Sequence, residues 1–151
     1  MNTKTIILTC CLATLLLTSC ASTQYVAQHQ VTMPIYSNRA CIEVSEDWFN
    51  NNSGANFFIG EFGYWLKNRG IDVVINRDIG SQGMYIVPYF RPQYYLRWDG
   101  CWIWIFHNVY IDIYSSDRYK LKTLYLGEIK SGTSPGNLRA VFTRSITLTR
   151  Y

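Results

Sequence analysis

Hydrophobic residues along the chain follow two spacings, and these predict the first elements of a folded domain. Residues 39–45 alternate between apolar and polar positions, as a half-buried strand does. Between residues 55 and 66 the apolar side chains lie three or four positions apart, which is typical of an amphipathic helix: Ala55, Phe58, Ile59, Phe62, Trp65 and Leu66. Polar residues 50–53 suit the helix start, and Gly70 suits a left-handed end.

Further strands are predicted over residues 71–76, 84–90, 94–98, 101–114 and 121–129. Pro88 indicates an edge or a bulge, because proline cannot donate a hydrogen bond to a neighbouring strand. Residues 138–149 fit a helix by spacing and a strand by their threonines, and we favour the helix. The order β-α-β-β-β-β-β-α predicts an α+β fold, a two-layer sandwich of two helices on a mostly antiparallel sheet of five or six strands.

A hairpin around Asp99-Gly100 gives the clearest local signal, since Asp-Gly between two β-rich runs is typical of a two-residue turn. Such a turn pairs Trp98 with Cys101 and Leu96 with Ile103. One face then carries Tyr94, Leu96, Trp98, Cys101, Ile103 and Ile105, and the other carries Tyr95, Arg97, Trp102, Trp104 and Phe106. Both faces are apolar, and a strand that is apolar on both sides has to be covered on both.

The second of these faces is the candidate binding surface: Tyr95, Arg97, Trp102, Trp104 and Phe106. Trp and Tyr combine a large contact area with a polar group, and they concentrate at recognition surfaces. We expect this face to dock an envelope protein or a second copy of the chain. A glycan or a lipid is the alternative ligand. The remaining interpretation is that the protein's own helices cover the face and that it belongs to the core.

The first twenty residues carry a different pattern. Lys4 precedes an apolar stretch over residues 6–17, which is too short to span a bilayer and suits a secretory signal. It ends in Leu17-Thr18-Ser19-Cys20, which resembles the lipobox of bacterial lipoproteins. The resemblance implies cleavage before Cys20, a diacylglycerol on its sulfur and a further acyl chain such as palmitate on its amino group. No Asp follows Cys20, so the resemblance favours a periplasm-facing anchor in the outer membrane.

These observations divide the chain into a signal peptide (1–19), a lipidated tether (20–37) and one α+β domain (38–151). The acyl chains on Cys20 make the membrane an expected partner. The chain has 151 residues, with 14 Lys and Arg against 10 Asp and Glu and a net charge of +4. That charge is too small to argue for nucleic acid, and we expect no nucleic-acid partner.

Cysteine and histidine are scarce after the signal. Cys41 and Cys101 remain as a candidate disulfide in an oxidising compartment, and the alternative is two separate buried thiols. We expect no metal site and no cofactor, since Cys-x-x-Cys is absent and His107 is the one histidine after the tether. His107 is also the best candidate for a catalytic base, but we expect a partly exposed loop residue and assign no catalytic residue or enzyme activity.

The order of elements carries a second resemblance. A Cys in the first strand, an apolar helix closed by glycine, Trp98-Asp99 before a long hydrophobic strand and Gly127-Glu128 in the next are similar to a group of small bacterial lipoproteins of unknown function. The resemblance spans residues 39–146. It implies an envelope protein and provides no catalytic residues.

Overall fold

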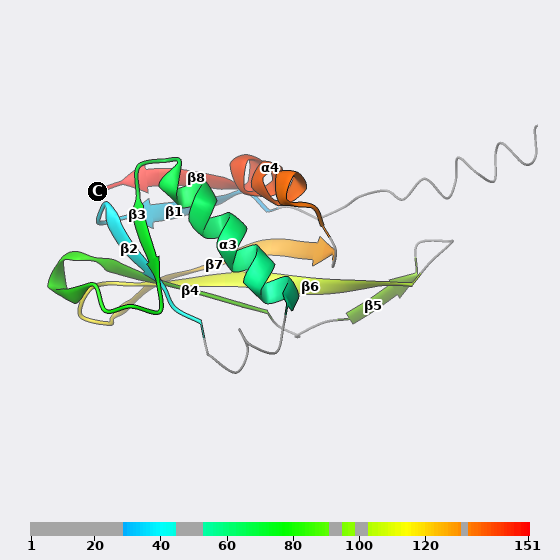
Figure 1. The fold of residues 1–151 in the computed structure, drawn as a ribbon, viewed down its shortest axis with the longest axis horizontal. Helices are drawn as coiled ribbons and strands as arrows, with labels where there is room; N and C mark the ends of the chain where they lie inside the picture. Colours follow the sequence, from blue (N-terminus) through cyan, green and yellow to red (C-terminus); the bar gives the residue numbers. More distant parts are fainter. Residues whose placement is uncertain (1–28, 45–52, 91–94, 99–102, 131–132) are drawn as a thin grey trace, which may run out of the picture.

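Over the residues that the structure describes, the fold contains two sheets and two helices (Figure 1). A computed structural model describes residues 29–44, 53–90, 95–98, 103–130 and 133–151, with backbone alone at residues 53–56, 95, 97, 98 and 104. The strands are β1 (Val31–Ile35), β2 (Arg39–Ile42), β3 (Asp72–Ile75), β4 (Met84–Phe90), β5 (Tyr95–Trp98), β6 (Ile103–Tyr114), β7 (Lys120–Lys130) and β8 (Ile146–Arg150). The helices are α3 (Ser53–Lys67) and α4 (Pro135–Ser145), and a short 3₁₀ turn, η1, covers Gly80–Gln82.

The larger sheet runs β3-β2-β4-β6-β7, and β5 pairs with the start of β6 on the same edge as β4. Strand β2 is parallel to β3 and β4, whereas β6 is antiparallel to β4, β5 and β7. The α+β class is therefore confirmed, but the prediction of a mostly antiparallel sheet is wrong. The parallel pairs arise because α3 connects β2 to β3 as a crossover, which brings the chain back in the same direction.

The smaller sheet joins β1 to β8 in parallel, with Val31 opposite Ile146 and Ile35 opposite Arg150. This pairing corrects two predictions. Residues 31–35 were expected in the tether, yet Met33 and Ile35 are buried in the core. The stretch 138–149 is a helix as far as Ser145 and a strand from Ile146, so each interpretation of that stretch was right for one half of it.

Both helices and the β1–β8 pair lie on one face of the larger sheet (Figure 1). Rings from the two helices meet there, with Phe58 and Phe62 each 5.3 Å from Phe142 between ring centroids. Fully buried side chains fill the space between the layers: Met33, Ile42, Ile59, Phe62, Leu66, Met84, Ile86, Ile111, Ile113, Leu124 and Phe142. One continuous core therefore holds both ends of the described chain against the sheet.

Helix α3 confirms the predicted spacing and the predicted end. Gly70 has a φ of +78°, in the left-handed region. Its N–H donates to the Lys67 carbonyl at 3.0 Å, and the Ile71 N–H donates to the Leu66 carbonyl at 3.3 Å. This pair of bonds is a Schellman motif, and Leu66 and Ile71 are both buried beside it.

The hairpin register differs from the prediction by two residues. Trp98 pairs with Ile103 and Leu96 with Ile105, so four residues separate the strands rather than two. The turn itself, residues 99–102, lies outside the described residues. Because the shift is even, the backbone positions that share a face are still those predicted.

Cys41 is a free thiol with no exposed surface, so the predicted disulfide is not supported. Cys101 lies outside the described residues. Cys41 pairs with Tyr85, which pairs with Tyr114 at one end of β6, and Ile103 is at the other end. The eleven residue steps along β6 from Ile103 to Tyr114 span roughly 37 Å. A disulfide requires the Cα atoms of its two cysteines to lie within about 7 Å.

The two glycines Gly70 and Gly60 should respond in opposite ways to alanine. We expect Gly70→Ala to lower the free energy of unfolding by about 1–2 kcal/mol, because an L side chain is strained at that φ. Gly60 lies in the exposed helix interior, and a Cβ there meets nothing within 4 Å. Gly60→Ala should therefore raise it by about 1 kcal/mol. Urea unfolding followed by tryptophan fluorescence checks both, and changes of equal sign would contradict this account.

Candidate functional site

The predicted binding residues fall in the hairpin formed by β5 and the start of β6. Tyr95 pairs with Phe106, and Arg97 pairs with Trp104. The side chains of Tyr95, Arg97 and Trp104 and the whole of Trp102 lie outside what the structure describes. Phe106 is only 4% exposed, so it is a buried residue and the prediction that it belongs to the binding surface is wrong.

The sheet face opposite the helices carries a row of tyrosines. Tyr89 on β4, Tyr110 on β6 and Tyr125 on β7 are direct neighbours across the strands. Ring centroids are 5.4 Å apart for Tyr89 and Tyr110 and 4.8 Å apart for Tyr110 and Tyr125. His29 extends the row, 4.9 Å from Tyr125. The three tyrosine side chains are half-buried, and His29 is exposed. We name Tyr89, Tyr110, Tyr125 and the neighbouring Asp112 the tyrosine face.

The ring orientations determine what this face presents to solvent. Tyr89 and Tyr110 are stacked at an interplanar angle of 12°, and Tyr110 and Tyr125 at 28°. Their flat surfaces therefore pack against one another rather than standing open. The Tyr125 hydroxyl donates to Asn108 Oδ1 at 2.8 Å, and burial raises the pKa of Tyr125 above its usual value. The row offers hydrogen-bonding edges rather than open ring faces.

Asp112 is a buried carboxylate on the tyrosine face, with its side chain 9% exposed. Lys120 Nζ lies 2.7 Å from Oδ2, and Thr123 Oγ1 donates to Oδ1 at 2.5 Å. The hydroxyls of Tyr89 and Tyr114 donate over 3.4 and 3.5 Å. The Asp112 carboxylate raises the pKa of Lys120. Four partners thus compensate the desolvation of one charge and fix the tyrosines around it.

A second polar cluster closes the end of the sheet beyond the tyrosine face. The Arg118 guanidinium lies 3.5 Å from the centroid of the Tyr85 ring and 2.5 Å from Glu43 Oε2. The Glu43 hydrogen bond raises the pKa of Arg118. Asp78 accepts from the Gly80 N–H and the Tyr85 hydroxyl, and these bonds lower its pKa. Because these groups satisfy one another above buried Cys41, the cluster is a structural cover.

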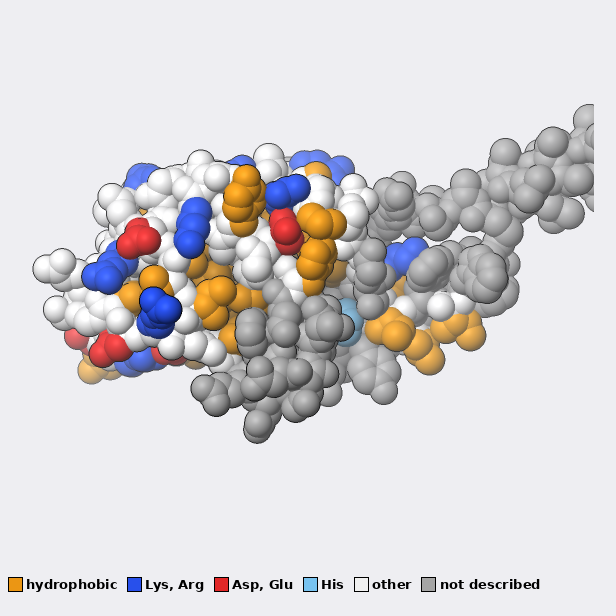
Figure 2. Space-filling model, viewed as in Figure 1, with side chains coloured by type: hydrophobic (Ala, Val, Ile, Leu, Met, Phe, Trp, Pro, Cys, Tyr) orange, Lys and Arg blue, Asp and Glu red, His pale blue; other side chains and the backbone are white. Residues whose placement is uncertain are grey.

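The helix-side face of the hairpin carries exposed aliphatic side chains. Leu96 is 62% exposed, Ile103 63% and Ile105 42%. Leu96 and Ile105 are opposite each other, and Ile103 follows two residues along the same strand. Hydrophobic side chains gather at this end of the molecule, where β5 and β6 extend beyond the helices (Figures 1 and 2). We name these three residues the apolar patch.

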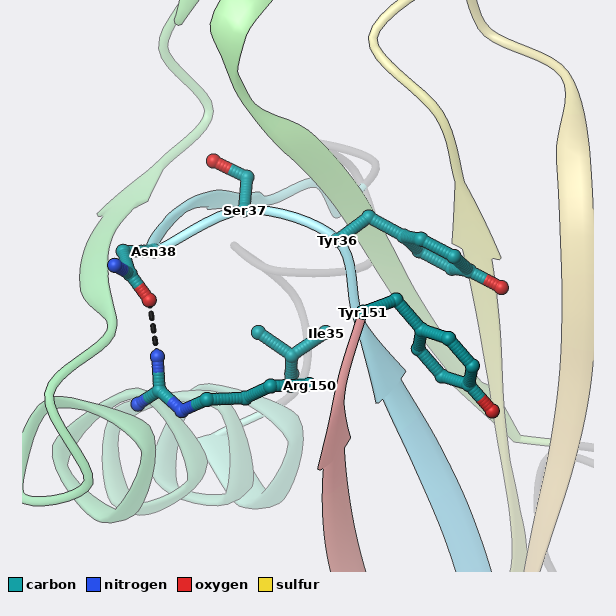
Figure 3. Close-up of a pocket in the computed structure, with 6 residues that line it drawn as sticks. All are labelled: Ile35, Tyr36, Ser37, Asn38, Arg150 and Tyr151. Atoms are coloured by element: carbon teal, nitrogen blue, oxygen red, sulfur yellow. Dashed lines mark hydrogen bonds between the residues drawn. The ribbon is translucent and has the colours of Figure 1, made fainter.

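A small pocket of about 230 Å³ lies between the end of β1, the residues that follow it and the carboxyl-terminal end of β8 (Figure 3). Tyr36 and Tyr151 stack on one side, 5.2 Å apart between centroids. On the other side Arg150 donates to Asn38 Oδ1 and, at 3.0 Å, to the Arg69 carbonyl near the end of α3. The guanidinium is thus committed to joining β8, β2 and α3, and we assign the pocket a structural role.

His107 lies within β6 rather than in a loop, which corrects that prediction. It pairs with Ile129, and its ring centroid is 4.9 Å from that of Phe90. In the part of the chain that the structure describes, no three His, Cys, Asp or Glu side chains come together as a metal site would need.

The predicted binding residues lie in the hairpin, and the residues of the tyrosine face are not among them. Tyr89 and Tyr110 each occupy one position in a strand of alternating residues. Taken one strand at a time, such a position looks like part of an ordinary amphipathic pattern. Only the registers of β4 with β6 and of β6 with β7 place the three tyrosines side by side. The sequence signal for this face was the alternation of Tyr110, Asp112 and Tyr114 along β6.

Comparison with known proteins adds little. No family model matches the chain, and no curated protein matches it. Among solved structures it is similar to a minor lipoprotein from Acinetobacter baumannii, with a TM-score of 0.37 and 9% sequence identity over 71% of this chain and 87% of that one.

Asp112 should be important for stability. We expect Asp112→Asn to lower the free energy of unfolding by about 1–3 kcal/mol, since buried hydrogen-bond donors lose a charged acceptor. Asp117→Asn, at an exposed turn, is the control and should change it by less than about 0.5 kcal/mol.

The decrease in the free energy of unfolding caused by Asp112→Asn should also depend on pH. The raised pKa of Lys120 means that the protonated lysine stabilises the fold. That contribution is complete below the unfolded pKa of about 10.4 and disappears as pH rises through the higher folded value. Urea unfolding at pH 8 and pH 11 checks this, and an unchanged difference between wild type and variant would contradict a role for the ion pair.

Proposed function

We propose that this protein is a non-catalytic, lipid-anchored component of the bacterial cell envelope that docks a protein partner through its tyrosine face. The observation that carries the docking role is the row of half-buried tyrosines on the sheet face opposite α3 and α4. Tyrosine is enriched at protein interfaces because its ring supplies contact area and its hydroxyl supplies a hydrogen bond.

The anchor rests on the resemblance of Leu17-Thr18-Ser19-Cys20 to a lipobox, which lies outside the described residues. Over the described residues, none of the helices combines the length and the apolar character that crossing a bilayer requires. Two or three acyl chains on Cys20 would provide a lasting attachment, because each buried methylene adds about 0.8 kcal/mol. We place this anchor in the outer membrane, facing the periplasm.

A protein partner is favoured over a glycan at the tyrosine face. Sugars bind aromatic residues by lying flat on an open ring surface, and the stacked rings of Tyr89, Tyr110 and Tyr125 use those surfaces on one another. The half-buried tyrosine rings and the Asp112–Lys120 pair can instead supply contact area and hydrogen bonds to a protein surface. Glycan binding remains the alternative for the hairpin aromatics Tyr95 and Trp104.

Metabolic labelling with an alkyne fatty acid tests the anchor. Wild-type protein should acquire the label and fractionate with outer membranes, because its new amino-terminal Cys20 receives the acyl chains. Cys20→Ala should remain unlabelled. Label of equal intensity in both proteins would exclude Cys20 as the lipidated residue.

Photocrosslinking in intact cells tests the docking surface. A benzophenone amino acid in place of Tyr110 should form a discrete adduct, whereas the same group in place of Tyr64 should not. Tyr64 is 51% exposed on α3, on the helix layer, and is therefore the matched control.

The adduct should also depend on the neighbouring rings. It should disappear when Tyr89 and Tyr125 are both changed to Ser and persist when exposed Tyr119 is changed to Ser. An adduct at twice the protein's mass would identify a second copy as the partner, and an adduct removed by glycan hydrolases would favour the glycan. Identical patterns at positions 110 and 64 would refute the docking role.

A further inference from the structure

The apolar patch is exposed because the sheet is longer than the layer that covers it. Val109, Ile111 and Ile113 are fully buried on the helix side of β6. Ile103 and Ile105 continue the same alternation along the same strand, yet they are 63% and 42% exposed. Figure 1 shows β5 and the start of β6 extending past α3 and α4. The patch therefore has the composition of a core surface but lacks the helix that would complete it.

The direction of β1 determines which end of the larger sheet its first residues approach. The His29 N–H donates to the Leu126 carbonyl at 3.3 Å, and Lys122 Nζ donates to the Thr32 carbonyl at 2.9 Å. Residues 29 and 32 therefore lie beside residues 126 and 122 of β7, so β1 runs in the direction opposite to β7. Strand β7 ends at Lys130 beside Phe106, next to the patch. The start of β1, preceded by His29, is therefore directed toward the end of the sheet that carries the patch.

The lengths are compatible with a shared membrane surface. His29 lies against Tyr125, which pairs with Tyr110. Along β6, Ile105 is roughly 17 Å and Ile103 roughly 24 Å from Tyr110. Cys20 precedes His29 by nine residues, which reach at most about 30 Å and average about 15–18 Å as a coil. Acyl chains on Cys20 and the apolar patch can thus enter one bilayer surface without a stretched linker.

The composition of the hairpin suits the boundary between lipid and water. Residues 94–106 contain two charged side chains, Arg97 and Asp99, and five Trp or Tyr residues: Tyr94, Tyr95, Trp98, Trp102 and Trp104. Trp and Tyr concentrate at the headgroup level of membranes, and aliphatic side chains prefer the acyl region just below it. The exposed aliphatics and this composition point to the same environment.

We propose that the apolar patch, Leu96, Ile103 and Ile105, inserts into the headgroup region of the bilayer that holds the acyl chains of Cys20, as a second membrane contact that fixes the domain's orientation. This inference rests on the lipid anchor of the proposed function. The occupant is the phospholipid surface itself, because the start of β1 is directed toward the end of the sheet that carries the patch and His29 follows the anchor by nine residues.

Spin labelling of the full lipidated protein tests the contact. The protein is reconstituted into vesicles of phosphatidylethanolamine and phosphatidylglycerol, with Cys101→Ser to remove the second thiol; Cys41 is fully buried. A nitroxide is placed at Ile103→Cys and, as control, at Tyr119→Cys, which is 73% exposed and lies at the opposite end of β6. Collisions with oxygen, which concentrates in lipid, are compared with collisions with a water-soluble nickel chelate.

The label at position 103 should show an oxygen-to-nickel ratio several-fold above that at position 119. Leu96→Cys, 62% exposed on the same face, provides a second probe if the first variant misfolds. Equal ratios in protein that still floats with the vesicles would overturn the second contact and leave the anchor intact. Dipolar broadening between labels at 103 would overturn it in favour of a second copy. Protein that carries no acyl chain and does not float would refute the proposed function as well.

Discussion

Strand β6 is the constraint on which the other parts of the structure depend. Its twelve residues pair with β7 on one edge and with β4 and β5 on the other. Helices of fifteen and eleven residues rise about 1.5 Å per residue, whereas a strand rises about 3.4 Å. A twelve-residue strand is therefore roughly two and a half times as long as an eleven-residue helix, so the helix layer leaves part of it uncovered. The uncovered end is where the apolar patch lies.

The two faces of β6 differ in the kinds of side chain that they carry. On the helix side the side chains of β6 are aliphatic except for His107, so the face is stable where α3 and α4 cover it and costly where they do not. On the opposite side, half-buried tyrosines surround the buried charge of Asp112, and the hydroxyls of Tyr89, Tyr114 and Tyr125 donate to polar side chains of the same face. Such a face tolerates water and can also be buried by a partner.

The sequence pattern correctly predicted those elements that depend on interactions between residues close together in the chain. The apolar spacing of α3 and the glycine at its end were readable because a helix and its cap involve neighbouring residues. The α4 start was missed, although Ser134 caps it and Pro135 occupies its first turn, a known signal. The parallel pair β1–β8 joins residues more than a hundred positions apart, and no local pattern encodes such a pairing. For the same reason the tyrosine face, which two strand registers assemble, was not predicted. The faces of the hairpin were predicted correctly although its register was wrong by two residues.

The β1–β8 pair also changes how the domain relates to its anchor. A tether as long as residues 20–37 would let the domain turn freely above a membrane. Because β1 is instead part of the core, nine residues separate Cys20 from His29, and the start of β1 is directed toward the end of the sheet that carries the apolar patch. The patch and the tyrosine face lie on opposite sides of the sheet. A bilayer contact through the patch would therefore leave the tyrosine face directed away from the lipid, so the two surfaces can be occupied at the same time.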